Sequence, residues 1–163
     1  MSEVPEEKQK KLTLVLISGD MDKAFAAFTI AAGAAAMGYE VVMFFTFWGM
    51  KTIQKGNPTG KGLFGKMLSL MNRGGIDRVG PSRLNFGGVG RWMFKKMMKD
   101  KGVASLPELR QTAIDLGVKL LACTTSMDVM EISRDDLIPE VTDCVGVATM
   151  LQEAGESDVQ FFI

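Results

Sequence analysis

The sequence predicts an α/β domain with a mostly parallel sheet and a helical insertion. Short apolar runs of strand length alternate with segments of helical periodicity, as in consecutive βαβ units. The strand runs are almost unbroken in apolar character, which is typical of parallel strands covered by helices on both faces. The chain has 163 residues, 47% of them hydrophobic, and is long enough for one full core. We therefore expect a disordered leader over 1–11 and a single domain over 12–163.

The first half of the domain is predicted to hold two strands joined by a helix. The run LTLVLIS over 12–18 is apolar and short, as expected for a buried strand. An alanine-rich helix over 23–37 follows, and Gly38 is its stop signal. β-Branched and aromatic residues then predict a strand over 40–47. Because this change interrupts the apolar stretch over 24–48, we interpret that stretch as two soluble elements and not as a membrane helix.

The third predicted strand lies between two helices. A helix is expected over 105–117, because Ser105 and Glu108 have the spacing of a capping box. The apolar run over 118–123 predicts the strand, and a short helix is expected over 126–132.

A helix and a strand are predicted to close the chain. Thr142 is the expected N-cap of the last helix, and Gly155 is its expected stop. The run DVQFFI over 158–163 predicts the final strand. Cys144 would lie in or just before that helix, where packing is its expected role.

Residues 55–100 form a predicted insertion that differs from the rest of the chain. They contain ten of the 18 glycines, and ten Lys or Arg residues against two acidic ones, a net charge of +8. The remaining residues carry −8, so the neutral chain is strongly polarised. Apolar residues at helical spacing predict amphipathic helices over 62–73 and 91–102. Insertions of this length more often act as a lid or docking element than as structural filler.

The absence of histidine restricts the chemistry that the chain can perform. It removes Ser-His-Asp and Cys-His catalysis, histidine proton transfer and histidine-based metal sites. The two cysteines, Cys123 and Cys144, are not in a CxxC pair and cannot complete a cysteine-built zinc site. No metal and no cofactor is therefore expected. The polar, charged N-terminus does not resemble a secretory signal, and we expect a cytoplasmic protein.

Cys123 is the main candidate for a reactive residue. It lies at the carboxyl end of a predicted strand, just before a helix, where ligands and reactive groups collect in parallel sheets. A helix N-terminus lowers the pKa of a thiol, and the hydroxyls that follow could also bind the sulfur. A nearby carboxylate, Asp128, would raise that pKa. The hydroxyl residues concerned are Thr124, Thr125 and Ser126. Equally, Cys123 could be an inert, buried residue, since cysteine is often fully buried.

Met127 and Met130 follow Cys123 at positions that could bring three soft ligands together, which Cu(I) favours. However, Cys123 is expected on a strand, not on their helix, and the chain contains 13 methionines. We interpret the two methionines as packing around the cysteine.

Nucleotide and nucleic-acid signals are weak. The glycines of GGVGRW, over 87–92, do not follow a predicted strand, and there is no Walker motif. The basic insertion carries no nucleic-acid module pattern, so no nucleic-acid partner is expected. Its charge is compatible with a solvated face or with electrostatic capture of an anion or an acidic partner.

Three segments, over 16–53, 95–130 and 146–163, resemble the DsrE-like family of sulfur-transfer proteins. The most specific motifs are FTFWG, at 45–49, and C-x-x-S-M-D-V-M, at 123–130. The resemblance is greatest to the branch with a long insertion after the second strand. It implies a flavodoxin-like three-layer sandwich and a homo-oligomer, commonly a trimer or hexamer.

The resemblance also implies that Cys123 carries sulfur as a persulfide. Residues of two loops would line the same edge of the sheet, namely Ser18, Gly19, Asp20, Trp48 and Gly49. Two positions depart from the family pattern: Glu131 stands where relatives tend to have glycine, and Cys144 where they tend to have a small residue.

The sequence thus predicts a cytoplasmic sulfur carrier or sulfurtransferase. Its partners would be sulfur donor and acceptor proteins or low-molecular-weight persulfides, without nucleic acid and without membrane contact. Lys95, Lys96 and Lys99 of the insertion are expected to dock an acidic partner. The alternative is a non-enzymatic binding or assembly module that is oligomeric and in which Cys123 is only packed.

Overall fold

The computed structural model describes residues 8–163 and has one sheet of five parallel strands. The strand order is β4-β3-β2-β1-β5, so the first four strands are added in one direction and the last returns to the far edge. The predicted α/β fold with a parallel sheet is confirmed. The strands are β1 Lys11–Leu16, β2 Glu40–Phe45, β3 Lys119–Cys123, β4 Asp143–Val145 and β5 Val159–Phe162.

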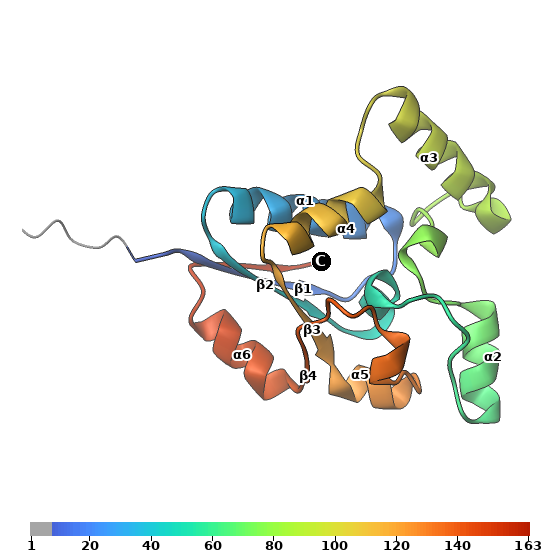
Figure 1. Cartoon of the computed structure of the whole chain (residues 1–163). Coiled ribbons are helices and arrows are strands. Elements are labelled where there is room, and N and C mark those ends of the chain that lie inside the picture. The colour runs from blue at the N-terminus through green and yellow to red at the C-terminus, as the bar shows by residue number, and fades with distance from the viewer. Residues whose placement is uncertain (1–7) are drawn as a thin grey trace, which may run out of the picture.

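Helices lie on both faces of the sheet (Figure 1). Helices α1 (Met21–Ala36) and α4 (Leu106–Asp115) pack together on one face. Helix α6 (Val147–Gly155) lies on the opposite face, and α5 (Thr124–Val129) follows β3 directly at the carboxyl edge (Figure 1). These three layers bury two separate apolar clusters, one on each face of the sheet.

The two clusters are unequal in size. Leu14, Met43 and Leu120 belong to the larger one, which also includes the buried sides of α1 and α4. The smaller one holds five buried residues, which alternate along the strands with those of the larger cluster. It consists of Val15, Val42, Phe44, Leu121 and Cys123. The side chain of Cys123 therefore belongs to the smaller cluster, on the face of the sheet that α6 covers.

Most local signals of the sequence are confirmed. The capping box of α4 is formed, with the N–H of Glu108 donating to the hydroxyl of Ser105 and its carboxylate accepting in return. Gly38 follows α1 with a φ of 86°, a left-handed conformation that suits glycine. After α5 the chain forms a short 3-10 helix, η4 (Arg134–Asp136).

The prediction for the segment after Thr142 is wrong. Residues 143–145 form the edge strand β4, and α6 begins only at Val147, after Gly146. The hydroxyl of Thr142 accepts a hydrogen bond from the N–H of Leu120 (3.1 Å) and does not cap the helix. Cys144 consequently lies in a strand. A strand of three residues has too short an apolar pattern to stand out in the sequence.

The first strand begins one residue earlier than predicted, at Lys11. The expected disordered leader over 1–11 lies partly outside the described residues, which begin at residue 8. Lys11, which the prediction placed in the leader, is buried in β1. Its ammonium group binds the carboxylate of Glu153 in α6 (2.7 Å) and that of Glu156 (3.0 Å). This ion pair fastens α6 to the sheet.

The insertion extends from the carboxyl edge of the sheet, beside the core (Figure 1). Its helices are α2 (Leu63–Met71) and α3 (Val89–Asp100), with short 3-10 helices η2 (Ile76–Arg78) and η3 (Phe86–Gly88) between them. Both predicted amphipathic helices therefore form. Their large apolar side chains are mostly exposed, for example Phe64, Leu70 and Trp92. Among residues 8–163, none of the helices combines the length and the apolar character that a membrane span requires.

Candidate functional site

Cys123 is the last residue of β3 and the N-cap residue of α5. Its backbone is extended, with φ −73° and ψ 115°, so the chain turns directly from strand to helix at this residue. The residue is only 7% exposed. Val145, its partner in β4, and Met150 of α6 are partly buried against the same cluster. The sequence placed Cys123 at this junction, and the structure has it there.

Two hydroxyl groups from neighbouring strand ends meet beside Cys123. The oxygens of Thr46, after β2, and Ser126, in α5, lie 2.7 Å apart. The N–H of Phe47 donates to the Ser126 hydroxyl (3.0 Å). Whichever hydroxyl donates to the other, the second keeps its proton free to bind the sulfur. One O–H of the pair is therefore available to donate to a thiolate at position 123.

These donors outweigh the effect of burial on the thiol. Burial opposes ionisation of Cys123, but the Ser126 hydroxyl and N–H, the Thr46 hydroxyl and the Thr125 N–H favour the thiolate. Together they hold the pKa of Cys123 below its usual value. Thr46 was not among the predicted site residues. Its position directly after the second strand, in the FTFWG motif, was the available signal.

Cys144 has the opposite electrostatic environment. Burial raises the pKa of the Cys144 thiol, and the neighbouring Asp143 adds to this effect, while Arg134 only partly opposes it. No disulfide joins the two cysteines. Of the two thiols, only Cys123 therefore has a pKa below the usual value.

The loops after β1 and β2 are in close contact at this edge. After Thr46 the chain forms a 3-10 helix, η1 (Phe47–Ile53), which the sequence analysis did not predict. The N–H of Gly49 donates to the carbonyl of Ile17 (2.8 Å), and a Cβ at Gly49 would lie 2.1 Å from the carbonyl oxygen of Leu16. A Cβ at Gly19 would lie 2.7 Å from the carbonyl oxygen of Trp48. Only glycine fits at either contact.

The predicted loop residues are therefore adjacent, but not all of them reach the cysteine. Ser18 donates to the carboxylate of Asp20 (2.9 Å), which also binds Lys23 (3.2 Å). Within residues 8–163, the hydrogen bonds of this group do not extend to Cys123 or its hydroxyl pair. Its link to the cysteine is indirect, through η1.

The residues that follow Cys123 separate into two groups. Ser126 is fully buried beside the sulfur, whereas Thr124 donates to the carbonyl of Val145 (3.4 Å). Met127 and Met130 pack with the larger apolar cluster, on the face of the sheet opposite to Cys123. The structure thus does not bring the two methionines together with the cysteine sulfur, because strand alternation directs Cys123 to the other side.

Glu131 connects the end of α5 to the insertion. Its carboxylate accepts hydrogen bonds from the N–H groups of Lys61 and Gly62, the latter at 2.7 Å. These two N–H groups hold the pKa of Glu131 below its ordinary value. The backbone of Glu131 has a φ of 51°, a left-handed conformation that glycine adopts more easily. This explains why a glycine is expected at this position from the resemblance.

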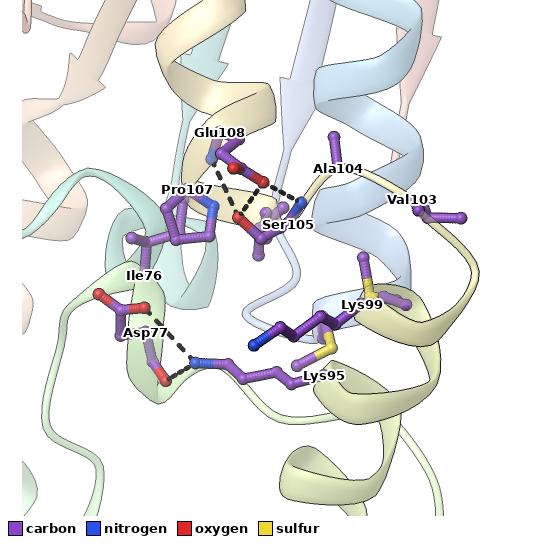
Figure 2. A pocket seen from close by; sticks show the side chains of 13 residues that line it. Ile76, Asp77, Lys95, Lys99, Val103, Ala104, Ser105, Pro107 and Glu108 are labelled. Atoms are coloured by element: carbon purple, nitrogen blue, oxygen red, sulfur yellow. Dashed lines mark hydrogen bonds and ion pairs between the residues drawn. The ribbon is translucent and has the colours of Figure 1, made fainter.

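The predicted docking lysines lie on α3 (Figure 2). Lys95 and Lys99 extend into a cavity of about 600 Å³ between α3 and the start of α4. Lys95 donates to the carbonyl (2.9 Å) and the carboxylate (3.4 Å) of Asp77 in η2. Lys96 pairs with Asp100 (3.0 Å) on the exposed side of the helix. Two of the three lysines thus have an acidic partner within the chain.

The fold and the junction at Cys123 define an α/β protein whose candidate reactive group is a thiol. The chain belongs to the DsrE/DsrF/DrsH-like family, because the model of that family matches residues 8–162. This confirms the resemblance found in the sequence.

Two relatives match over almost their whole length. The uncharacterized protein YrkE of Bacillus subtilis (strain 168) is 44% identical over 159 residues, covering 96% of this chain and 99% of the relative. The sulfur carrier protein DsrE2 of Allochromatium vinosum is 34% identical over 169 residues, with the same coverage of 96% and 99%.

Solved structures share the fold at low identity. The crystal structure of the YchN protein of E. coli has a TM-score of 0.60 and 12% identity, and the match covers 95% of this chain and all of that one. The protein of unknown function MTH1491 of Methanobacterium thermoautotrophicum has a TM-score of 0.54 and 11% identity, with 94% and 99% covered. The predicted flavodoxin-like α/β class is thereby confirmed.

Proposed function

We propose that this protein is a sulfur carrier that holds sulfane sulfur as a persulfide on Cys123 and passes it to a partner thiol. The observation that carries the proposal is the environment of Cys123, where a strand end, a helix start and a hydroxyl pair favour the thiolate. Family membership and the name of the Allochromatium vinosum relative, a sulfur carrier protein, support the same chemistry.

The transfer needs two thiol exchanges and no net oxidation. The Cys123 thiolate attacks the outer sulfur of a donor persulfide, the donor's S–S bond breaks, and the donor leaves as a thiolate. Cys123 then carries the sulfur as Cys–S–S⁻ after loss of a proton. A partner thiolate attacks the terminal sulfur, the Cys123 S–S bond breaks, and the Cys123 thiolate is released.

The hydroxyl pair would act in both exchanges. An O–H that stabilises the attacking thiolate also stabilises the same thiolate when it is the leaving group. Because both steps use thiolates and neither needs a general base, the chain can perform them without histidine. Ser126 and Thr46 are thus positioning residues that also tune the sulfur.

We propose sulfur donor and acceptor proteins, or low-molecular-weight persulfides, as the partners, and the cytoplasm as the compartment. Both cysteines of the chain are free thiols, as in proteins of a reducing compartment. A homo-oligomer, a trimer or hexamer, is proposed as well. Exposed apolar side chains along α6 and β5, namely Val147, Leu151 and Phe162, support an interface on that side of the sheet.

We propose further that the lysines of α3 dock an acidic partner. Lys99 is the most available of the three, because Lys95 and Lys96 already bind Asp77 and Asp100. Reversing all three charges should slow sulfur delivery to an acidic acceptor at low salt and have little effect at high salt. Delivery that is unchanged at low salt would leave these lysines as a solvated face.

The carrier proposal is tested by intact mass after incubation with polysulfide. Wild type and Cys144→Ser should gain the mass of one sulfur atom, which a reductant removes, and Cys123→Ser should not. Absence of the adduct on wild type, or an equal adduct on Cys123→Ser, contradicts the proposal. Far-UV circular dichroism of each variant verifies that the fold is retained.

The second candidate is an oligomeric assembly module in which Cys123 is only packed. The low exposure of Cys123, 7%, and the exposed apolar side chains of α2 and α3 favour it. In that case the same experiment should show no adduct, while Cys123→Ser should leave the oligomeric state, measured by light scattering, unchanged.

A further inference from the structure

A cavity of about 750 Å³ lies between η1 and the insertion, away from the residues that surround Cys123. Its volume lies in the range of small-molecule sites, roughly 300 to 1,000 Å³. Five cationic side chains line it against one carboxylate, that of Asp77. The five cations come from separate segments of the chain and are Lys51, Arg73, Arg78, Arg91 and Lys95.

Most of these cations have only neutral partners. Lys95 alone has a carboxylate within 4.0 Å among residues 8–163. Lys51 donates to the side-chain carbonyl of Asn72 (2.5 Å), and Arg73 to the backbone carbonyl of Gly56 (2.7 Å). Arg91 donates to the carbonyl of Arg78 (2.8 Å). The guanidinium groups therefore keep N–H donors for a further acceptor.

The start of α3 contributes to the same cavity. Gly88 lines it and is the N-cap of this 12-residue helix, with a φ of 110° and no side-chain cap. A Cβ at Gly88 would lie 3.3 Å from Nη2 of Arg91, and a Cβ at Gly90 would lie 2.0 Å from the carbonyl oxygen of Leu84. The glycines of GGVGRW, which no predicted function used, thus allow the helix to begin beside the arginines. The positive end of a helix attracts anions.

Lys51, Arg73 and Arg91 are partly buried, whereas Arg78 and Lys95 are exposed at the rim. Partly burying several like charges is unfavourable unless an opposite charge is nearby. Burial lowers the pKa of Lys51, and Arg91 lowers it further, while Asp20 raises it without forming an ion pair within residues 8–163. A bound anion would relieve this repulsion. Planar guanidinium groups suit the geometry of tetrahedral oxyanions, since each can donate two parallel hydrogen bonds.

We propose that this cavity binds a tetrahedral oxyanion group with two negative charges, of the sulfate, thiosulfate and phosphate class. Arg73, Arg78 and Arg91 would hold its oxygens, and Lys51 would lie at the inner wall, beside the loop after β1. The proposal does not depend on persulfide chemistry at Cys123. It assigns a role to the basic charge of the insertion that is separate from docking a partner.

Calorimetric titration of the full chain with sulfate, thiosulfate and phosphate, at constant ionic strength, tests the proposal. Adenosine monophosphate is added as a further probe, because it carries the same group on a larger ligand. At least one probe should bind saturably. Arg78→Gln should weaken that binding about tenfold, since hydrogen bonds to charged groups are among the strongest. The double variant Arg73→Gln, Arg91→Gln should weaken it further.

The control is the double variant Lys66→Gln, Lys101→Gln, which removes two charges outside the cavity, one on α2 and one just after α3. Its binding should equal that of wild type. Heats that do not saturate, or equal losses in the control and the arginine variants, would overturn the proposal in favour of a diffuse basic surface. Binding of adenosine monophosphate alone, if lost in Arg78→Gln, would support the site and assign the anion to a larger ligand. Arg78 makes no side-chain hydrogen bond within residues 8–163, so its variant should fold normally.

Discussion

Cys123 and the residues next to it are buried and closely packed, whereas most of the large apolar side chains of α2 and α3 are exposed to solvent. Ser126 is fully buried, while Leu70 of α2 is 85% exposed. Both regions lie at the same edge of the sheet (Figure 1). We propose that this difference reflects a division of roles, in which the close-packed junction holds the sulfur of Cys123 and the loosely packed insertion binds other molecules.

The largest effect on stability is expected at Gly49, where the backbone is in close contact with Leu16. Gly49→Ala should destabilise the protein by about 3 kcal/mol, because its Cβ would overlap the carbonyl oxygen of Leu16. The matched control is Gly33→Ala, in the middle of α1 with nothing within 4 Å, which should stabilise by about 0.5–1 kcal/mol. Urea unfolding measures both. A small effect at Gly49 would show that this edge can relax.

The hydroxyl pair offers a test of the junction's chemistry. Ser126→Ala should raise the pKa of Cys123 and slow its alkylation by iodoacetamide near neutral pH about tenfold, because an O–H and its bond to the thiolate are lost. The Cys144→Ser background isolates the signal of Cys123. Ser133→Ala, which alters a hydroxyl bonded only near η4, is the control. An unchanged rate profile with pH would mean that Ser126 does not tune the thiol.

Glu131 tests how the insertion is attached. The pKa of Glu131 is lowered by its hydrogen bonds to the N–H groups of residues 61 and 62. These bonds therefore stabilise the attachment of the insertion fully above the ordinary carboxyl pKa of 4.5, and this stabilisation is lost as the pH falls through the lower pKa of the folded state. Hydrogen exchange in peptides covering 56–66 should therefore speed up on acidification, relative to the intrinsic rate. It should also be faster in Glu131→Gln at neutral pH, but not in the exposed control Glu140→Gln. Equal exchange in all three proteins would argue against an attachment at Glu131.

The smallest effect is expected on the exposed face of α2. Leu70→Ser should change the free energy of unfolding by less than about 0.5 kcal/mol. Leu14→Ala, at a fully buried position of β1, should cost about 2–5 kcal/mol in the same experiment. If Leu70→Ser cost more than about 1 kcal/mol, α2 would be covered in the native assembly, and the comparison between the two regions would need revision.

Features with a local cause were predictable from the sequence. The capping box of Ser105 and Glu108 and the stop at Gly38 depend on residues only a few positions apart. The apolar runs located four of the strands at nearly correct bounds, and the end of β3 placed Cys123 correctly.

Features that depend on distant contacts were not predictable. The hydroxyls of Thr46 and Ser126 are 80 residues apart in the sequence and meet only because β2 and β3 are neighbours. The helix η1 is joined to the loop after β1 by the bond of Gly49 to Ile17, a contact between two strand ends. Strand β4 was missed because its three residues have no apolar pattern of their own. The methionines after Cys123 were assigned to its surroundings by sequence proximity, whereas the alternation of the strand separates them.

The register of β3 and β4 has a consequence for any sulfur bound at Cys123. Cys144 pairs with Ala122, and Cys123 pairs with Val145, so the two cysteines are one step out of line on adjacent strands. Cys144 packs with the larger cluster and Cys123 with the smaller one, so the two side chains lie on opposite faces of the sheet. The sheet itself therefore keeps the second thiol from attacking a persulfide on the first. A sulfur atom bound at Cys123 therefore cannot be released by formation of a Cys123–Cys144 disulfide. Its release requires a thiol from another molecule.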